Sequence, residues 1–151
     1  MDDVLVNKAA TIERCIKRIK EEYKGSELEF EENYTKQDSI ILNLERASQA
    51  CIDMGTRVIR MKKLGVPQSS RDVFIILEKS GIINAELGQK LQKMVGFRNI
   101  AVHDYQDLNL DIIAAMLYAD LEQGVATPCS FLIDSLRKFY FNPKPRFPAY
   151  F

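Results

Sequence analysis

The stretch that decides the fold is residues 35–61, TKQDSIILNLERASQACIDMGTRVIRM. From Ile40 to Met61 its apolar side chains recur at steps of three and four residues, which places them on one face of a helix. Thr35 and Asp38 have the spacing of a capping box and predict the start of this helix. Because Gly65-Val66-Pro67 ends it, we predict the longest helix of the chain here.

Helical patterns continue on both sides of this stretch. Residues 4–23 show the same one-sided spacing up to Gly25, and an acidic connector over 25–36 follows. On the other side, Ser69 or Ser70 can cap a short helix through the apolar run 73–77. That run also suits a buried strand, but the caps and Gly81 favour a helix covered on all sides by its neighbours.

The remaining elements are predicted from caps and breaks. Asn84 caps a helix that ends near His103 to Tyr105, and Asn109 caps another that runs to Leu121. Gly124 or Pro128 interrupts the pattern before a last amphipathic piece over 131–139. We therefore predict an all-α, up-and-down bundle of about five or six helices in one domain, residues 1–140. Residues 141–151 contain three prolines and form a C-terminal tail.

Composition excludes several classes of protein. The chain has 151 residues, 46% of them hydrophobic, which is enough for one domain with its own core. Lysine plus arginine and aspartate plus glutamate both number 21, so any RNA binding must come from local basic groups. The apolar runs fall short of the ~20 residues of a membrane helix, and Met-Asp-Asp-Val is unlike a secretory signal, so we expect a cytoplasmic protein.

The cysteines give no sign of a metal or disulfide site. Cys15, Cys51 and Cys129 are an odd number without CxxC spacing, and the first two fall on apolar helical faces. Reduced structural thiols are the expected state. The sequence also has no glycine-rich phosphate loop, and we expect no cofactor.

One polar cluster, Arg98-Asn99-Ile100-Ala101-Val102-His103-Asp104-Tyr105, contains the only histidine of the chain. On an ideal helix Asn99 and His103 share a face, whereas Arg98 and His103 point about 140° apart. A bend near His103, with the turn before it loosened by Gly96, would allow them to converge. His103 could then move protons near neutral pH, and the Arg98 guanidinium could hold a phosphate transition state.

This pair of groups suits RNA cleavage, in which the 2′-hydroxyl attacks the adjacent phosphate and no metal is required. Two proton transfers are easiest with two titrating groups, so a symmetric dimer would supply the second histidine. From the chemistry alone, however, a lone histidine at a helix end is more often a cap or a surface group. Tyr105 is likewise more often a core aromatic with its hydroxyl at the rim.

The spacing of Arg98, His103 and Tyr105 resembles the motif of the HEPN superfamily, and specifically that of the HepT toxins. The flanking stretches 42–44, 50–53, 65–72 and 91–97 are similar too, and the resemblance runs from the N-terminus to about Leu121. After Leu121 a continued helix would be expected, and residues 124–128 depart from that pattern.

The resemblance implies an all-helical bundle that dimerises around the motif helix and forms a composite, metal-independent endoribonuclease site. By position, Arg98 would stabilise the phosphate, His103 would be the acid/base group and Asn99 would support the cleft. The family's partner is a minimal nucleotidyltransferase antitoxin, which is expected to transfer AMP to Tyr105 and so block RNA. The alternative is a non-catalytic helical adaptor, or a nucleotide-binding partner of such a nucleotidyltransferase.

Overall fold

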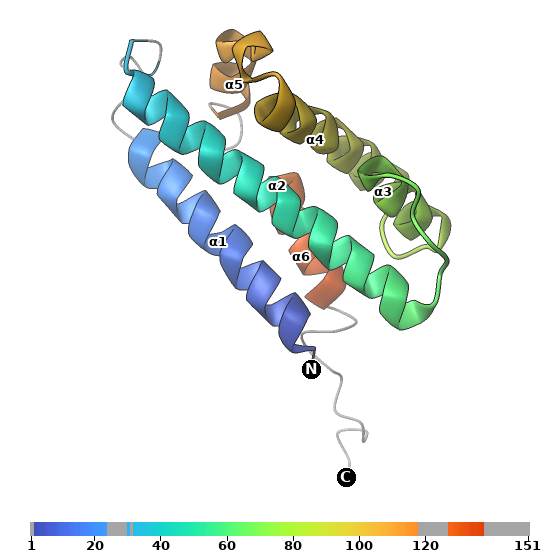
Figure 1. Cartoon of the computed structure of the whole chain (residues 1–151). Helices are drawn as coiled ribbons and strands as arrows, with labels where there is room; N and C mark the ends of the chain where they lie inside the picture. Colours follow the sequence, from blue (N-terminus) through green and yellow to red (C-terminus); the bar gives the residue numbers. More distant parts are fainter. Residues whose placement is uncertain (1, 24–29, 31, 118–126, 138–151) are drawn as a thin grey trace.

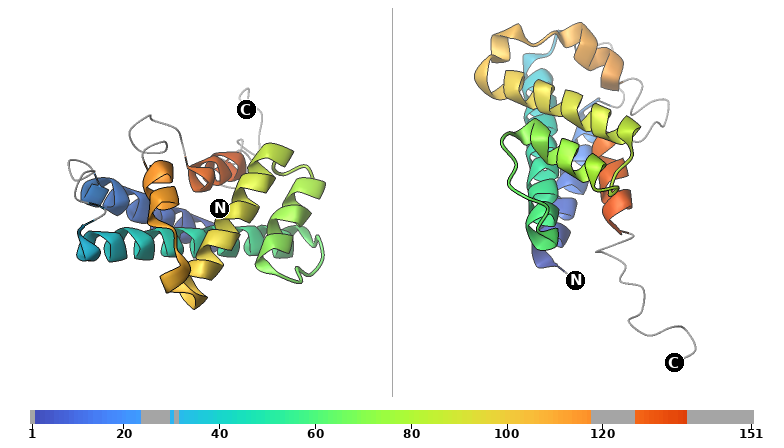
Figure 2. Two further views of the ribbon diagram at one scale, coloured as in Figure 1. Left: turned by 90° about the horizontal axis from the view of Figure 1, so that it is seen from above. Right: turned by 90° about the vertical axis from the view of Figure 1, so that its right-hand side faces the viewer.

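The computed structural model describes residues 2–23, 30, 32–117 and 127–137, and all regular structure within them is helical. The long helices α1 and α2 lie side by side and antiparallel, the α3–α4 hairpin crosses α2, and α6 lies behind (Figures 1 and 2). This arrangement confirms the all-α bundle. In chain order the elements are α1 (Asp3–Tyr23), α2 (Tyr34–Lys62), α3 (Ser70–Lys79), α4 (Ala85–His103), the 3-10 turn η1 (Tyr105–Asp107), α5 (Leu110–Leu117) and α6 (Pro128–Leu136).

The predicted start of α2 is wrong by two residues. Asn33 is the N-cap, and its side chain accepts a hydrogen bond from the Lys36 amide at 3.1 Å. Asparagine is at least as good a cap as threonine, so the earlier residue starts the helix. Asp38 is thereby left free of the capping box that the sequence suggested.

The end of α2 also comes before the predicted glycine. The helix ends at Lys62, and Lys63 adopts the left-handed conformation at φ 53°. The amide of Leu64 then bonds the Ile59 carbonyl at 3.0 Å, which satisfies a carbonyl of the last turn. Gly65 follows at φ 117°, so glycine is needed in the connector rather than at the cap.

The other predicted caps are confirmed. Ser69 accepts from the Asp72 amide at 3.1 Å, Asn84 from the Leu87 amide at 2.8 Å, and Asn109 from two amides at the start of α5. The run 73–77 is therefore helical. It is not covered on all sides, because a helical period turns Ile75 and Ile76 partly toward solvent.

Pro128 is the first residue of α6, and Thr127 caps this helix by accepting from the Ser130 amide at 3.1 Å. Proline fits here because the first helical N–H has no partner within the helix. The predicted extension of α5 to Leu121, the piece beyond residue 137 and the tail 141–151 lie outside the described residues.

The main core is formed by α1, α2, α3, α4 and α6. The three cysteines are buried and free, and the Cys129 thiol lies 3.3 Å from the sulfur of Met94. Burial raises the pKa of Cys15 and of Cys51, which keeps these thiols protonated and unreactive. They act as small apolar core residues.

A second core cluster supports the far end of α4. Ile19, Ile40 and Ile41 of α1 and α2 form its centre, and Phe97 and Ala101 of α4 pack against it. Tyr23, Phe30 and Ile113 complete the buried set, and Leu44, Leu108 and Leu110 are partly buried beside it. This cluster holds the last turns of α4, η1 and the start of α5 against α1 and α2.

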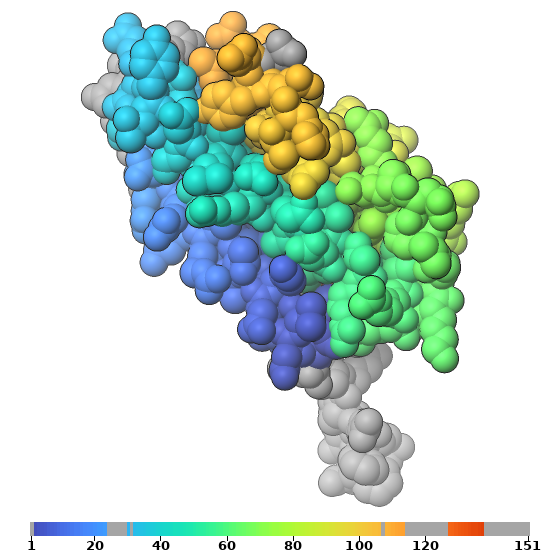
Figure 3. Space-filling view, in the orientation of Figure 1, coloured from blue at the N-terminus to red at the C-terminus, as the bar shows by residue number. Residues whose placement is uncertain are grey.

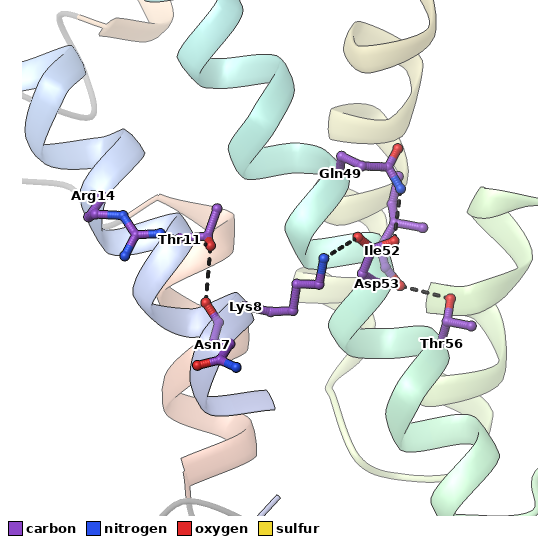
Figure 4. A network of polar contacts seen from close by, with 8 residues as sticks. All are labelled: Asn7, Lys8, Thr11, Arg14, Gln49, Ile52, Asp53 and Thr56. Carbon is purple, nitrogen blue, oxygen red and sulfur yellow. Dashed lines mark hydrogen bonds and ion pairs between the residues drawn. The ribbon is translucent and has the colours of Figure 1, made fainter. Parts of the chain in front are cut away.

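Polar contacts on the surface fix α1 against α2. Figure 4 shows Lys8 reaching Asp53, whose carboxylate lies 3.0 Å from the ammonium and also accepts from Gln49 at 2.9 Å. At the start of α1, Asp2 pairs with Arg57 at 2.8 Å. No helix in the described part of the chain has the length and apolar character needed to cross a bilayer.

Candidate functional site

The polar cluster occupies the last turns of α4 and the turn that follows. Helix α4 is uninterrupted through Arg98 and His103, and the Asp104 amide closes it by bonding the Ile100 carbonyl at 2.8 Å. The structure thus shows no break in α4 near His103, where the sequence predicted that the helix bends. On a regular helix the two side chains leave the axis about 140° apart.

Arg98 lies toward the bundle. It shares the face of α4 that carries the buried Leu91 and Val95, and its own side chain is half-buried. Its Nη1 donates to the Asn99 amide oxygen at 3.2 Å, while its buried Nε has no partner among the described residues. An unpaired buried N–H costs roughly 1–3 kcal/mol, so an anionic oxygen at this position would be favoured.

His103 and Asn99 lie on the outer side of α4. Both side chains are exposed, and their i, i+4 spacing places them on one face, as the sequence predicted. Within the described chain no hydrogen bond joins Arg98 to His103. The Arg98 side chain thus leaves α4 on the bundle side, while its Nη1 reaches the side chain of Asn99, which shares the outer face with His103.

Tyr105 is held by a residue that the sequence did not point to. Its hydroxyl donates a hydrogen bond to the carboxylate of Asp38 on α2. Burial of the hydroxyl and the nearby Asp38 carboxylate raise the pKa of Tyr105 to about 12. The side chain is 44% exposed, so the interpretation of Tyr105 as a core aromatic is wrong.

Asp38 could not be found from local pattern because 67 residues separate it from Tyr105. Figure 3 shows the segment after α4 lying against the first half of α2 on the surface of the molecule. The only local signal at Asp38 was the spacing to Thr35, which suggested a cap. The structure assigns its carboxylate to Tyr105 instead.

Gly96 also has a role different from the predicted one. It lies within the regular part of α4, and a Cβ built there would be 2.8 Å from Nη2 of Arg71 on α3. Because Gly96 has no side chain, the Arg71 guanidinium can lie against α4 at this point. Gly96 is about two turns before His103 and on the same side of the helix. No group of three or more histidine, cysteine or acidic side chains suited to a metal occurs within the described residues.

Comparison with known proteins matches this chain to HepT-like ribonucleases. The family described as "Ribonuclease HepT-like" matches residues 12–126. The chain is 52% identical over 122 residues to the mRNA nuclease HepT of Shewanella oneidensis, covering 81% of this chain and 91% of that protein. It is 29% identical over 80 residues to the tRNA nuclease HepT of Aphanizomenon flos-aquae, covering 53% and 54% of the two chains.

Comparison with solved structures also matches this chain to a HEPN toxin. A solved structure of the tri-AMPylated Shewanella oneidensis HEPN toxin in complex with MNT antitoxin matches with a TM-score of 0.82 at 46% identity. The match covers 91% of this chain and 99% of that chain. The extent of these matches, together with the arginine, histidine and tyrosine at the end of α4, shows that the chain belongs to the HepT-like ribonuclease family.

Proposed function

We propose that the protein is the toxin of a toxin–antitoxin pair. It is an endoribonuclease that cleaves RNA without a metal ion, and an MNT nucleotidyltransferase neutralises it by transferring AMP to Tyr105. The observation that carries the proposal is the exposed His103 at the end of α4, with Arg98 and Tyr105 at family spacing, in a chain 52% identical to an mRNA nuclease. The site of action is the cytoplasm.

The chemistry follows from three side chains. His103 takes the proton of the attacking 2′-hydroxyl or returns one to the leaving 5′-oxygen, since an imidazole titrates near neutral pH. Arg98 stabilises the charge that develops on the phosphate, and Asn99 supports the cleft through its bond to Arg98. DNA lacks the attacking hydroxyl and is not cut by this route.

The geometry favours a site shared by two copies. The side chains of Arg98 and His103 leave α4 about 140° apart, and each chain offers a single histidine, so a second copy would supply the group for the second proton transfer. Beside them the outer side of α4 exposes Ile100 and Val102, apolar side chains that a second copy would cover. We therefore expect a homodimer formed around α4, with both motif helices lining one cleft.

Neutralisation needs no unfolding. Tyr105 follows His103 by two residues and lies at the surface, so a nucleotidyltransferase can approach its side chain. Each AMP adds a negatively charged phosphodiester and a bulky nucleoside next to the site. That group repels the RNA backbone and occupies the entrance to the cleft.

The test is cleavage of RNA by the purified protein in EDTA. Cleavage should persist with the chelator present, and His103→Ala and Arg98→Ala should each abolish it while the helical circular dichroism stays unchanged. Incubation with MgATP and the MNT antitoxin should add AMP mass to the protein and stop cleavage. If the variants cut as well as the wild type, the assignment of these residues to the ribonuclease site fails. If the wild type does not cut RNA, a non-catalytic adaptor is the better account.

A further inference from the structure

The Tyr105 hydroxyl has one hydrogen-bonding partner in the described structure, the carboxylate of Asp38. Both residues are exposed, Asp38 in the first turns of α2 and Tyr105 in η1 directly after α4. A protein that carries a nucleotide can therefore approach this pair of side chains from the surface. Asp38 is not used as a helix cap, and the proposed ribonuclease chemistry does not need it.

The backbone on both sides of this hydrogen bond is anchored. On α2, Gln37 is buried and donates to the Phe30 carbonyl at 2.7 Å, and Ile40 is fully buried in the second core cluster. On η1, the Leu108 amide bonds the Tyr105 carbonyl at 3.2 Å, and the Leu108 side chain packs on the same cluster. The carboxylate and the phenol are thus held together before any partner arrives.

A phenol needs to lose its proton when it attacks a phosphate. With its pKa raised to about 12, only about one Tyr105 in 10⁵ is ionised at pH 7, so the reacting species is the neutral phenol. When a neutral hydroxyl group is the acceptor in phosphoryl transfer, a carboxylate acts as the general base and accepts its proton as the oxygen–phosphorus bond forms. Asp38 already accepts a hydrogen bond along that proton's path.

We propose that Asp38 is the catalytic proton acceptor for AMP transfer to Tyr105, so that the toxin supplies part of the machinery of its own neutralisation. This inference rests on the proposed function, in which Tyr105 is the acceptor. Tyr105 Oη forms a bond to the α-phosphorus of MgATP, the bond from that phosphorus to the β-phosphate oxygen breaks, and magnesium pyrophosphate leaves. The phenolic proton passes to Asp38 Oδ1 and from there to water.

The experiment measures the initial rate of AMP addition by intact-mass spectrometry. The full chain is incubated with MgATP and the MNT antitoxin of Shewanella oneidensis between pH 6 and pH 9.5. For the wild type we expect a rate that changes little with pH. Asp38→Asn should be slower by about 10²-fold or more, and its logarithmic rate should rise by one per pH unit because the reaction then depends on tyrosinate.

Two further variants separate proton transfer from structure and charge. Asp38→Glu keeps a carboxylate and should recover part of the rate together with the flat pH profile. Asp104→Asn removes a negative charge one residue from Tyr105 without touching the hydrogen bond, and it should react like the wild type. Circular dichroism and thermal unfolding of each variant check that the bundle is intact.

The proposal is overturned if Asp38→Asn reacts within about threefold of the wild type with the same pH profile. It is also overturned if Asp104→Asn loses as much rate, because the effect would then be one of general charge. Tyr105→Phe distinguishes this failure from failure of the proposed function. If that variant still gains AMP, or if the wild type gains none, the assignment of Tyr105 as acceptor is wrong whatever Asp38 does.

Discussion

Two glycines in the helices allow the helix packing to be tested with a single kind of substitution. Gly55 lies on α2 where α3 crosses it, and a Cβ added there would be 2.5 Å from Val73 Cγ1 and 3.3 Å from Leu77 Cδ1. Both of these side chains are buried and cannot turn aside. Overpacking of this kind costs about 1–3 kcal/mol, and the 2.5 Å approach places Gly55→Ala at the upper end.

Alanine also favours the helix over glycine by about 1 kcal/mol, so the net loss of unfolding free energy for Gly55→Ala is about 2 kcal/mol.

Gly88 on α4 provides the matched control. A Cβ there would meet the Glu78 carboxylate at 3.0 Å, and this is the end of a flexible, half-buried side chain that can move away. Gly88→Ala should therefore gain about 1 kcal/mol, since only the helix-propensity term remains.

The assay is thermal and urea unfolding followed by circular dichroism at one fixed protein concentration, because association would otherwise shift the result. The two variants should differ by about 3 kcal/mol, which for a chain of this size corresponds to about 6–12 °C in Tm. Equal stabilities, or a more stable Gly55→Ala, would refute the close crossing of α2 and α3 on which the reasoning depends.

Three further predictions concern the site and the ion pair at the start of α1. His103→Ala should change the unfolding free energy by no more than about 0.5 kcal/mol, because the side chain is exposed. The same variant should lower the rate of RNA cleavage by about 10²-fold or more. A large fall in Tm accompanying the loss of cleavage would show that His103 has a structural role instead. The hydrogen bond from the Arg57 guanidinium holds the pKa of Asp2 in the folded protein below its usual value of 3.8. The pair therefore stabilises the fold fully above pH 3.8, and this stabilisation is lost as the pH falls through the pKa of Asp2 in the folded protein. Urea unfolding across pH 2–6 should show a weaker acid dependence in Arg57→Gln, and an unchanged dependence would contradict the pairing. The difference in tyrosinate absorbance between wild type and Tyr105→Phe, recorded just after a pH jump, should show Tyr105 ionising at about pH 12. Asp38→Asn should move this ionisation toward pH 10, and an unchanged ionisation would mean that the carboxylate does not act on the phenol.

The helices could be predicted because their signals are local. Ser69 and Asn84 each cap the helix that directly follows them, and the apolar spacing around them needs no distant partner. The start of α2 was predicted wrongly because Thr35 and Asp38 have the spacing of a capping box, whereas Asn33, two residues earlier, is the residue that caps the helix. Such errors move an element by two residues and leave the fold unchanged.

The site was harder to predict because its contacts join distant segments. Arg98, His103 and Tyr105 were proposed from their spacing and the resemblance that it carries, whereas the contact of Asp38 with Tyr105 arises only because the segment after α4 lies against α2. Gly96 was read as a loosened turn, whereas it gives room to Arg71 from the preceding helix. A glycine in a helix has the same local signature in both cases, and only the neighbouring element distinguishes them.

The regularity of α4 decides how the ribonuclease site must be assembled. The sequence predicted a bend near His103 that would bring Arg98 and His103 together, and the structure shows α4 running without a break to His103. The buried Nε of Arg98 stays on the bundle side without a partner among the described residues, while its Nη1 bonds Asn99, which shares the outer face with His103. In-line attack on a phosphate needs charge stabilisation and two proton transfers at one phosphorus, and the described part of one chain offers a single histidine, so we propose that a second copy placed along α4 supplies the other. The proposed homodimer would then add a second histidine for the second proton transfer, and an active monomer at assay concentration would contradict this part of the proposal.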